Sequence, residues 1–352
     1  MIGYDKYELS ISGKEYYEDL FEKASKAKYS QIVNPCGEIS LNVTGGYCII
    51  GDVVPLFCDD SKDEETTVRS ATRFLIRVNL MDCLYKNETS RTNRIGVGLT
   101  GIHEYAWKKF GYGFYDLIDE SKSQDFWDNI ERLRLACEDE AEKYSNKLGV
   151  SIPHTVTTIK PSGSVSKLFA LTEGAHLPAM RYYVRNIQLQ SNDPVLQVYK
   201  DKGYPWYESK QYPNVTIVSF PTIPLISKLG MGDKLVTASE ATPEEQYQWL
   251  KLLEKYWLGE GNNQISYTLK FDIDKISLEE YKEMILKHQS DVRCCAVMPT
   301  VSQGKLKTKY EYLPEEEITE GKFIRMVSNI NDEEMKQEID LSTLVCQGAC
   351  PL

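Results

Sequence analysis

Several features that would assign this chain to a common class of protein are missing from its sequence. No stretch of about 20 apolar residues occurs in the 352 residues, so the sequence predicts no membrane span. The N-terminus has no basic segment followed by an apolar one, which a secretory signal would need. Basic residues are also fewer than acidic ones, 41 against 52. The net charge of −11 argues against nonspecific binding to nucleic acid or to acidic membranes.

Histidine is scarce, and the cysteines form no recognisable framework. The chain has 4 histidines and 9 cysteines, an odd number spread over a long sequence. This pattern predicts a reducing, cytoplasmic location, with thiols in chemical or core roles rather than in disulfides. The Walker A pattern and internal repeats are absent, which argues against a P-loop or repeat protein.

The most informative segment that is present is NPCGEISL at 34–41. Side chains alternate in an extended segment, so the spacing predicts that Asn34, Cys36 and Glu38 face one pocket. A thiol between an amide and a carboxylate suits a reaction at sulfur on a hydroxyl-bearing substrate, which its neighbours hold and deprotonate. The alternative is a buried structural cysteine in a turn formed by Pro35 and Gly37.

A second segment, TTIKPSGSVS at 157–166, reads as a strand that enters a hydroxyl-rich turn. Successive backbone N–H groups and serine hydroxyls at such a turn can bind phosphate. The alternative is an ordinary serine or glycine cap of a helix. The residues of this candidate phosphate loop are Ser162, Gly163, Ser164, Val165 and Ser166.

The C-terminus carries the third candidate, a pair of thiols at Cys346 and Cys350. Residues 311–340 hold ten acidic and three basic residues, a composition typical of a solvated or mobile tail. A close thiol pair on such an arm is competent for disulfide exchange. The alternatives are half of a zinc site and two incidental cysteines.

The remaining cysteines and a glycine string favour packing roles. Cys48 reads by itself as a core residue, and the adjacent Cys294 and Cys295 as packing residues. The string IGVGLTG at 95–101 matches a dinucleotide-binding pattern but lacks the preceding buried strand, so it predicts close backbone packing instead.

Hydrophobic periodicity predicts helices alternating with strands, and therefore an α/β fold. We expect three parts: a polar segment at 1–31 with a helical run near 16–28, a main body at 32–310, and the acidic tail at 311–352. Helices are predicted at 68–85, 123–148, 194–202, 243–259 and 278–287, and strands at 47–54, 155–159, 182–189, 215–220 and 264–269.

Taken together, the motifs resemble those of ribonucleotide reductase large chains. The matching segments are NPCGEISL at 34–41, NRIGVGLTG at 93–101, TTIKPSGSVS at 157–166, RYYVR at 181–185 and a closing C-x-x-x-C-P. They cover the chain from about residue 30 to 352. The NPCGE form is similar to that of the adenosylcobalamin-dependent, class II branch, which makes deoxyribonucleotides for DNA synthesis.

The resemblance implies the fold and the role of each residue in the first segment. The fold would be part of the ten-stranded α/β barrel of these enzymes, with a loop threaded through its centre. Cys36 on that loop would be the thiyl radical that takes the ribose 3′ hydrogen. Glu38 would be the base at the 3′ hydroxyl, and Asn34 would bind the ribose.

The remaining sites also acquire implied roles. Cys48 would be one of two active-site thiols that reduce the 2′ carbon, and the loop from Ser162 to Ser166 would hold the substrate phosphates. Cys346 and Cys350 would re-reduce the active-site disulfide, themselves reduced by a thioredoxin-like protein. Adenosylcobalamin would be the cofactor, with no metal ion bound by side chains.

The chain also departs from the reductase pattern. Only 33 residues precede Asn34, and none is cysteine. The resemblance therefore implies the C-terminal half of a split or interrupted reductase, whose other half carries the partner of Cys48. The tail thiols are also closer together than the four-residue gap of the pattern.

Two alternatives remain open. One is a class I-type chain that receives its radical from a di-metal subunit through a tyrosine pair, although Tyr310 and Tyr312 are not adjacent. The other is a non-catalytic fragment that acts only as a binding module.

Overall fold

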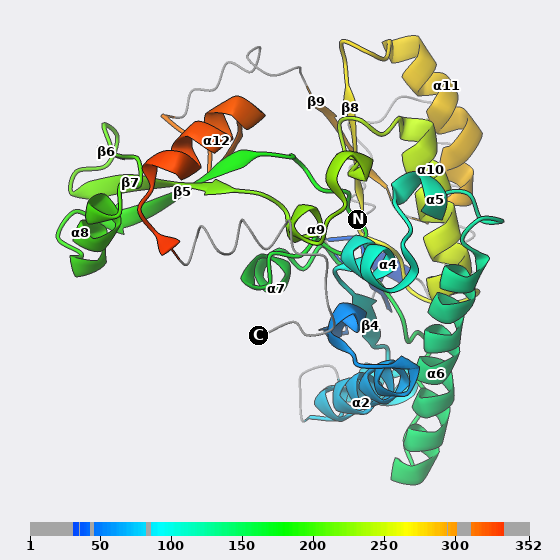
Figure 1. Cartoon of the computed structure of the whole chain (residues 1–352). Coiled ribbons are helices and arrows are strands. Elements are labelled where there is room, and N and C mark those ends of the chain that lie inside the picture. The colour runs from blue at the N-terminus through cyan, green and yellow to red at the C-terminus, as the bar shows by residue number, and fades with distance from the viewer. Residues whose placement is uncertain are drawn as a thin grey trace, which may run out of the picture.

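The computed structural model describes residues 31–34, 36–42, 46–81, 86–293, 295–300 and 311–333. The predicted helical run near 16–28 lies outside these residues. A helix-rich body, on the right of Figure 1, carries an arm built on a separate antiparallel sheet, on the left. Among the described residues, no helix is both long and apolar enough to cross a membrane.

The centre of the body is a run of parallel strand segments. Strand β3 (Ile50–Val53) pairs with β4 (Gly96–Leu99), and β4 in turn bridges the segment 155–159 through Val97 and Thr157. That segment bridges Ile265, just before β8 (Thr268–Asp272), and β8 pairs with β9 (Ala296–Thr300). All these pairings are parallel, and helices lie between the strands along the chain, so the α/β prediction is confirmed.

The body helices pack against this run and bury a large aromatic core. Its largest fully buried side chains include Trp127, Trp249 and Trp257. Helices α6, α10 and α11 line the outer side in Figure 1. The helices of the body are α2 (Ser61–Asn79), α3 (Lys86–Thr92), α4 (Ile102–Phe110), α5 (Phe114–Leu117), α6 (Gln124–Leu148), α7 (Gly163–Leu168), α9 (Leu225–Lys228), α10 (Pro243–Leu253) and α11 (Leu278–His288), with shorter turns at Pro55–Phe57, Gly232–Lys234 and Gln289–Asp291 and a π-helix at Glu254–Leu258.

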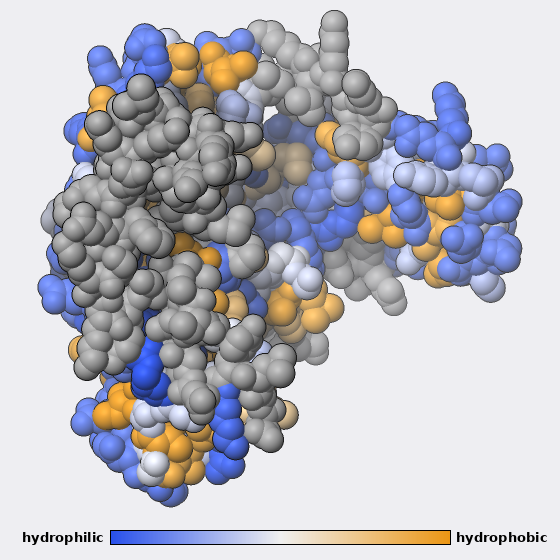
Figure 2. Space-filling view, turned by 180° about the vertical axis from the view of Figure 1, so that it is seen from behind, coloured by the Kyte–Doolittle hydropathy of each residue, from blue (hydrophilic) through white to orange (hydrophobic). Residues whose placement is uncertain are grey.

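Helix α2 is amphipathic, as its spacing predicts. Val68, Leu75 and Ile76 are buried, whereas Phe74 is 64% exposed. Met81, which the spacing predicts on the apolar face, lies beyond the end of the helix and is 67% exposed, so that part of the prediction is wrong. Figure 2 shows hydrophobic side chains gathered at the lower end of the molecule, where α2 lies in Figure 1. The helix ends at Asn79 rather than continuing to residue 85.

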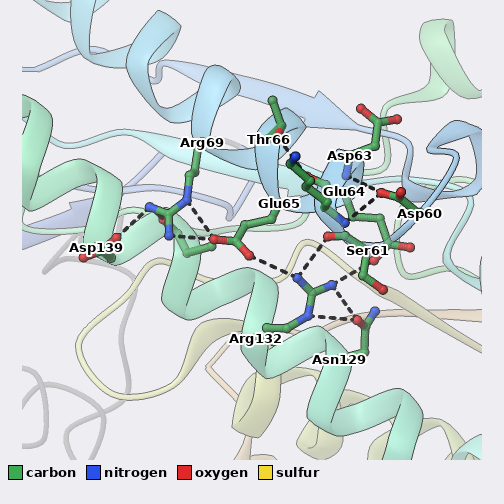
Figure 3. A network of polar contacts seen from close by, with 12 residues as sticks. Asp60, Ser61, Asp63, Glu64, Glu65, Thr66, Arg69, Asn129, Arg132 and Asp139 are labelled. Atoms are coloured by element: carbon green, nitrogen blue, oxygen red, sulfur yellow. Dashed lines mark hydrogen bonds and ion pairs between the residues drawn. The ribbon is translucent and has the colours of Figure 1, made fainter.

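A polar network joins α2 to α6 (Figure 3). The Asp60 carboxylate caps α2 by accepting from two backbone N–H groups, each at 2.9 Å. On α2, Arg69 pairs with Glu65 at 2.8 Å and with Asp139 of α6 at 2.6 Å. Arg132 of α6 reaches back to the buried Glu64 at 2.9 Å. These pairs tie α6 to α2, the helix that packs on β3.

The arm contains an antiparallel sheet with the strand order β10-β5-β7-β6. Its strands are β5 (Tyr183–Gln190), β6 (Trp206–Glu208), β7 (Val215–Thr222) and β10 (Glu315–Glu317), and helices α8 (Pro194–Asp201) and α12 (Glu320–Asn329) pack on it. β10 and α12 belong to the segment whose acidity predicts a mobile tail. They are folded because Ile318 and Phe323 are buried and Glu315 pairs with Arg185.

Most predicted elements are present within a few residues of their expected bounds. The helix predicted at 123–148 is α6, which Gly149 ends in the left-handed conformation at φ 69°. The segment 243–259 is not one uniform helix, because α10 passes into the π-helix. The segment 155–159 makes only isolated bridges to its two neighbours.

Candidate active site at the tip of the β1–β2 hairpin

The NPCGE segment forms the tip of a short hairpin between β1 (Gln31–Val33) and β2 (Ser40–Asn42). The Gly37 N–H donates to the Asn34 carbonyl at 3.0 Å, and Gly37 adopts φ 79°. The prediction that this segment is extended is therefore wrong. The turn buries Asn34 and Glu38 and leaves Cys36 exposed.

The Asn34 side chain organises the tip. Its Oδ1 accepts the backbone N–H groups of Glu38 at 2.8 Å and Ile39 at 3.0 Å. Its Nδ2 donates to Glu38 Oε2 at 2.6 Å and to Cys48 Sγ at 3.1 Å. One amide thus joins a carboxylate to a thiol 14 residues away. The candidate residues meet through this amide rather than through strand alternation.

Cys48 is exposed, so the interpretation of this residue as a core cysteine is wrong. Its surroundings nevertheless keep the thiol protonated. Loss of hydration raises the pKa of its thiol from 9.0 to about 11, and the Glu38 carboxylate adds to the rise. Cys36 also raises this pKa, whereas the Asn34 amide and the Lys160 ammonium lower it. Cys48 is therefore a neutral thiol at pH 7, in a cluster with Cys36, Glu38 and Lys160.

The hairpin tip is bonded to the strand run beneath it. The Glu38 carbonyl accepts the Gln264 backbone N–H at 2.9 Å and the Thr158 hydroxyl at 3.1 Å. Both partners lie in the central strand segments, and Thr158 precedes the candidate phosphate loop by four residues. The backbone at Glu38 is thus held by the strand that continues into that loop.

The candidate phosphate loop is a strand-to-helix turn, as predicted. Gly163, Ser164 and Val165 are exposed at the start of α7, where the first backbone N–H groups of a helix have no partner within it. Ser166 is buried, and its hydroxyl donates to the Ser162 carbonyl at 3.0 Å. Ser162 has φ 58°, and its hydroxyl donates to Asp52.

Asp52 and Lys160 also belong to the candidate site, although the sequence motifs assign no role to either. Asp52 lies on β3, and the Lys160 ammonium is 3.2 Å from its Oδ2. An acid inside the apolar run before Val53 was the available signal. Its partners at 160 and 162 are invisible to any local pattern, because they follow more than a hundred residues later.

The glycine string at 96–101 serves close packing, as predicted. Gly96 and Gly98 lie on β4, and all four residues of that strand are buried. A Cβ at Gly96 would lie 2.6 Å from a Thr158 methyl carbon, and one at Gly98 would lie 2.4 Å from Asp52 Oδ1. The strand therefore runs directly against two elements of the candidate site.

The other predicted cysteine sites are only partly described. Cys346, Cys350 and Cys294 lie outside the described residues. Cys295 is partly buried and packs against the main core, as its packing role predicts. Within the described ranges, no group of three or more His, Cys, Asp or Glu side chains could hold a metal ion.

Curated relatives match most of this chain. The adenosylcobalamin-dependent ribonucleoside-triphosphate reductase of Lactobacillus acidophilus is 29% identical over 349 residues, which cover 91% of this chain. Those of Lactobacillus gasseri and Lactobacillus leichmannii are 26% and 27% identical. The chain resembles the adenosylcobalamin-dependent ribonucleotide reductases, as its motifs predict. It spans about half the length of these relatives, covering 45% of each. No protein-family model matches the chain.

Solved structures give the same fold. A B12-dependent, class II ribonucleotide reductase superposes on 88% of this chain with a TM-score of 0.71, at 23% identity, and the match covers 44% of that chain. The class Id ribonucleotide reductase alpha subunit of Actinobacillus ureae superposes on 80% with a TM-score of 0.50, at 14% identity. The fold is therefore that of the reductase barrel segment, closer to the class II structure than to the class Id one.

Proposed function

We propose that this chain is the catalytic segment of an adenosylcobalamin-dependent ribonucleotide reductase, acting in the cytoplasm. The observation that carries the proposal is the Asn34 amide, which bonds both Glu38 and Cys48 beside the exposed Cys36. This arrangement brings a reactive thiol, a base and a reducing thiol together in one cluster.

Each group has a role in the proposed reaction. Cys36 in its thiyl form takes the hydrogen atom from the ribose 3′ carbon, and Glu38 accepts the proton of the 3′ hydroxyl. Asn34 keeps the Glu38 carboxylate oriented and binds the ribose. Cys48, protonated at pH 7, and a partner thiol together supply two hydrogens and two electrons: the 2′ hydroxyl leaves as water, hydrogen replaces it on the 2′ carbon, and the two sulfurs form a disulfide. The 3′ hydrogen returns from Cys36.

The exposed thiol at the hairpin tip fits the implied cofactor. A group as large as adenosylcobalamin can approach only a thiol that solvent reaches; Cys36 and Cys48 both meet that condition, and Cys36 is the one at the tip of the hairpin. When bound, the cofactor supplies the radical by homolysis of its cobalt–carbon bond. From this chain, we assign only Cys36 to face it.

We propose a second polypeptide as a partner, resembling the N-terminal half of a reductase and carrying the partner thiol of Cys48. Among the described residues, β3 and β9 each pair with one strand only, and four of the five residues of β9 are exposed. The exposed side chains of Phe74 on α2 and of Leu80 and Met81 just after it add an apolar surface. Open strand edges and apolar patches favour association. Cys346 and Cys350 are proposed to pass electrons from a thioredoxin-like protein to Cys48.

Reconstitution tests this function. The chain is mixed with a complementary reductase N-terminal polypeptide, adenosylcobalamin, a ribonucleotide and dithiothreitol, and deoxyribonucleotide is measured by chromatography. We expect turnover that Cys36→Ser abolishes, because an alcohol O–H is far harder to convert to a radical than a thiol. Cys295→Ser is the matched control and should retain activity.

Three outcomes would contradict the proposal. Product from the Cys36→Ser chain would remove the thiyl assignment. Turnover that requires a di-metal subunit and does not depend on adenosylcobalamin would favour a class I-type chain. Nucleotide binding without turnover by the reconstituted pair would favour a non-catalytic binding module.

A further inference from the structure

Asp52 is a buried charge that the core packing does not require. Its side chain is 3% exposed, and its Oδ1 has no hydrogen-bond partner. Burying a carboxylate costs several kcal/mol unless cations and donors compensate it. A charge that is buried at such a cost needs an explanation beyond packing. The two groups that compensate the charge of Asp52 are the Lys160 ammonium and the Ser162 hydroxyl. Both belong to the segment that leads into the candidate phosphate loop.

The strand opposite Asp52 is built to make room for the carboxylate. Asp52 and Gly98 are directly paired in the register of β3 and β4. A Cβ at Gly98 would lie 2.4 Å from Asp52 Oδ1, closer than any real contact. Only glycine leaves the space that this side chain occupies. The position of the carboxylate is therefore fixed by two neighbouring strands.

From this fixed point, Asp52 holds two residues of the loop. Its Oδ2 accepts the Ser162 hydroxyl and lies 3.2 Å from the Lys160 ammonium. Ser162 has φ 58°, a conformation that non-glycine residues rarely adopt and that the hydrogen bond helps to hold. Lys160 is 30% exposed, so part of its side chain stays open to solvent.

The charge of Lys160 also acts on a thiol of the candidate active site. Its positive charge lowers the pKa of the Cys48 thiol, which puts the ammonium within electrostatic reach of the candidate active site. The segment from Ser162 to Ser166 itself contains no cation. A substrate phosphate carries several negative charges, and a lysine next to backbone N–H groups is a common means of binding them.

We infer that Asp52 is a positioning residue that sets the phosphate loop, and that Lys160 is the cation this loop offers to a substrate phosphate. The inference rests on the proposed function, because it deepens the same site. Asp52 acts through Lys160 and Ser162 and does not itself touch the substrate. The ligand class is an oligophosphate group carried by a ribonucleotide.

The test measures binding of inorganic tripolyphosphate and of CTP to the full chain by isothermal titration calorimetry. Lys160→Met should raise both Kd values about tenfold, the loss of one charge-assisted contact. Asp52→Asn keeps the size of the side chain but removes the charge that holds Lys160, and should weaken binding by up to about tenfold. Tighter binding in Asp52→Asn would show that Asp52 only competes with phosphate for Lys160, and would overturn the inference. The matched control is Asp332→Asn, which removes the charge of another buried aspartate, paired with Lys202 at 2.9 Å in the arm. It should leave binding unchanged.

A double variant separates positioning from general destabilisation. If Asp52 acts through Lys160, then Asp52→Asn should cost little further affinity in a Lys160→Met chain. If Asp52→Asn does not fold, Ser162→Ala removes one of the same contacts from the more exposed side and should also weaken binding. Unchanged Kd values in Asp52→Asn, or full additivity in the double variant, would overturn the inference. Cys36-dependent turnover by a chain that does not bind tripolyphosphate would overturn it too, while leaving the proposed function intact.

Discussion

The reactivity of Cys48 gives a direct test of the cluster around Asn34. Glu38→Gln removes the carboxylate charge that raises the pKa of this thiol. The hydrogen bonds of 2.6 Å and 3.1 Å through the Asn34 amide put the sulfur within about 6 Å of that carboxylate. At this separation two charges interact by about 0.7 kcal/mol in water and about 1.4 kcal/mol at half that dielectric constant. The substitution should therefore lower the pKa of Cys48 by about 0.5 to 1.

The assay follows alkylation of Cys48 by iodoacetamide across pH, with peptide mapping by mass spectrometry. With a pKa of about 11, the thiolate fraction at pH 8 is roughly a hundredfold lower than that of an ordinary thiol. A thiolate of higher pKa is intrinsically more nucleophilic, which recovers about tenfold of that difference. Wild-type Cys48 should thus react about tenfold more slowly than an ordinary thiol at pH 8, and its rate should still rise above pH 10.

Glu38→Gln should make the rate level off at a lower pH, and should make Cys48 react about twofold to fourfold faster at pH 8. The control is Glu208→Gln, which removes the same charge from an exposed position on β6 and should leave the profile unchanged. A wild-type profile that levels off near pH 9 would refute the reasoning, as would an identical profile in Glu38→Gln. Either result would mean that the Asn34 amide does not hold this pair together in solution.

Two further predictions concern stability. Gly98→Ala should lower the free energy of unfolding by about 1 to 3 kcal/mol in urea denaturation, because the new Cβ overpacks a buried carboxylate. Gly321→Ala on α12, where the nearest atom would be 3.8 Å away, should cause no loss, and equal losses in the two variants would contradict the argument. Burial lowers the pKa of His103 from 6.5 to about 4. Between these two pH values His103 is therefore protonated in the unfolded chain but neutral in the folded one. Stability should therefore fall by up to about 3 kcal/mol as the pH drops from 6.5 to 4, and His103→Gln should flatten this slope.

The elements of this fold are largely readable from local sequence signals. Helix α6 is found almost to the residue, because Gly149 supplies the left-handed conformation that ends a helix. The folding of 311–333 is not readable in the same way. Its charge predicts a mobile tail, and only tertiary pairing of Glu315 and burial of Phe323 against the arm reverse that expectation.

The candidate site, too, could be predicted from the sequence only in part. The chemistry of their side chains predicts that Asn34, Cys36 and Glu38 belong to the site. The family resemblance predicts the same for Cys48. Their geometry depends on a turn at Gly37, which alternation along a strand cannot predict. Asp52 is missed because its partners Lys160 and Ser162 lie 108 and 110 residues away, and only strand pairing brings them together.

The hydrogen bond between Thr158 and Glu38 would limit which substrates the proposed site can accept. The Thr158 hydroxyl holds the backbone of Glu38, and the phosphate loop begins at Ser162 on the same strand. A run of four residues spans at most about 14 Å, and the chain cannot stretch beyond that. If the proposed site is correct, this length of chain would limit the distance between the phosphate group and the ribose of a bound substrate. All ribonucleotides share that distance, so the constraint would not distinguish their bases.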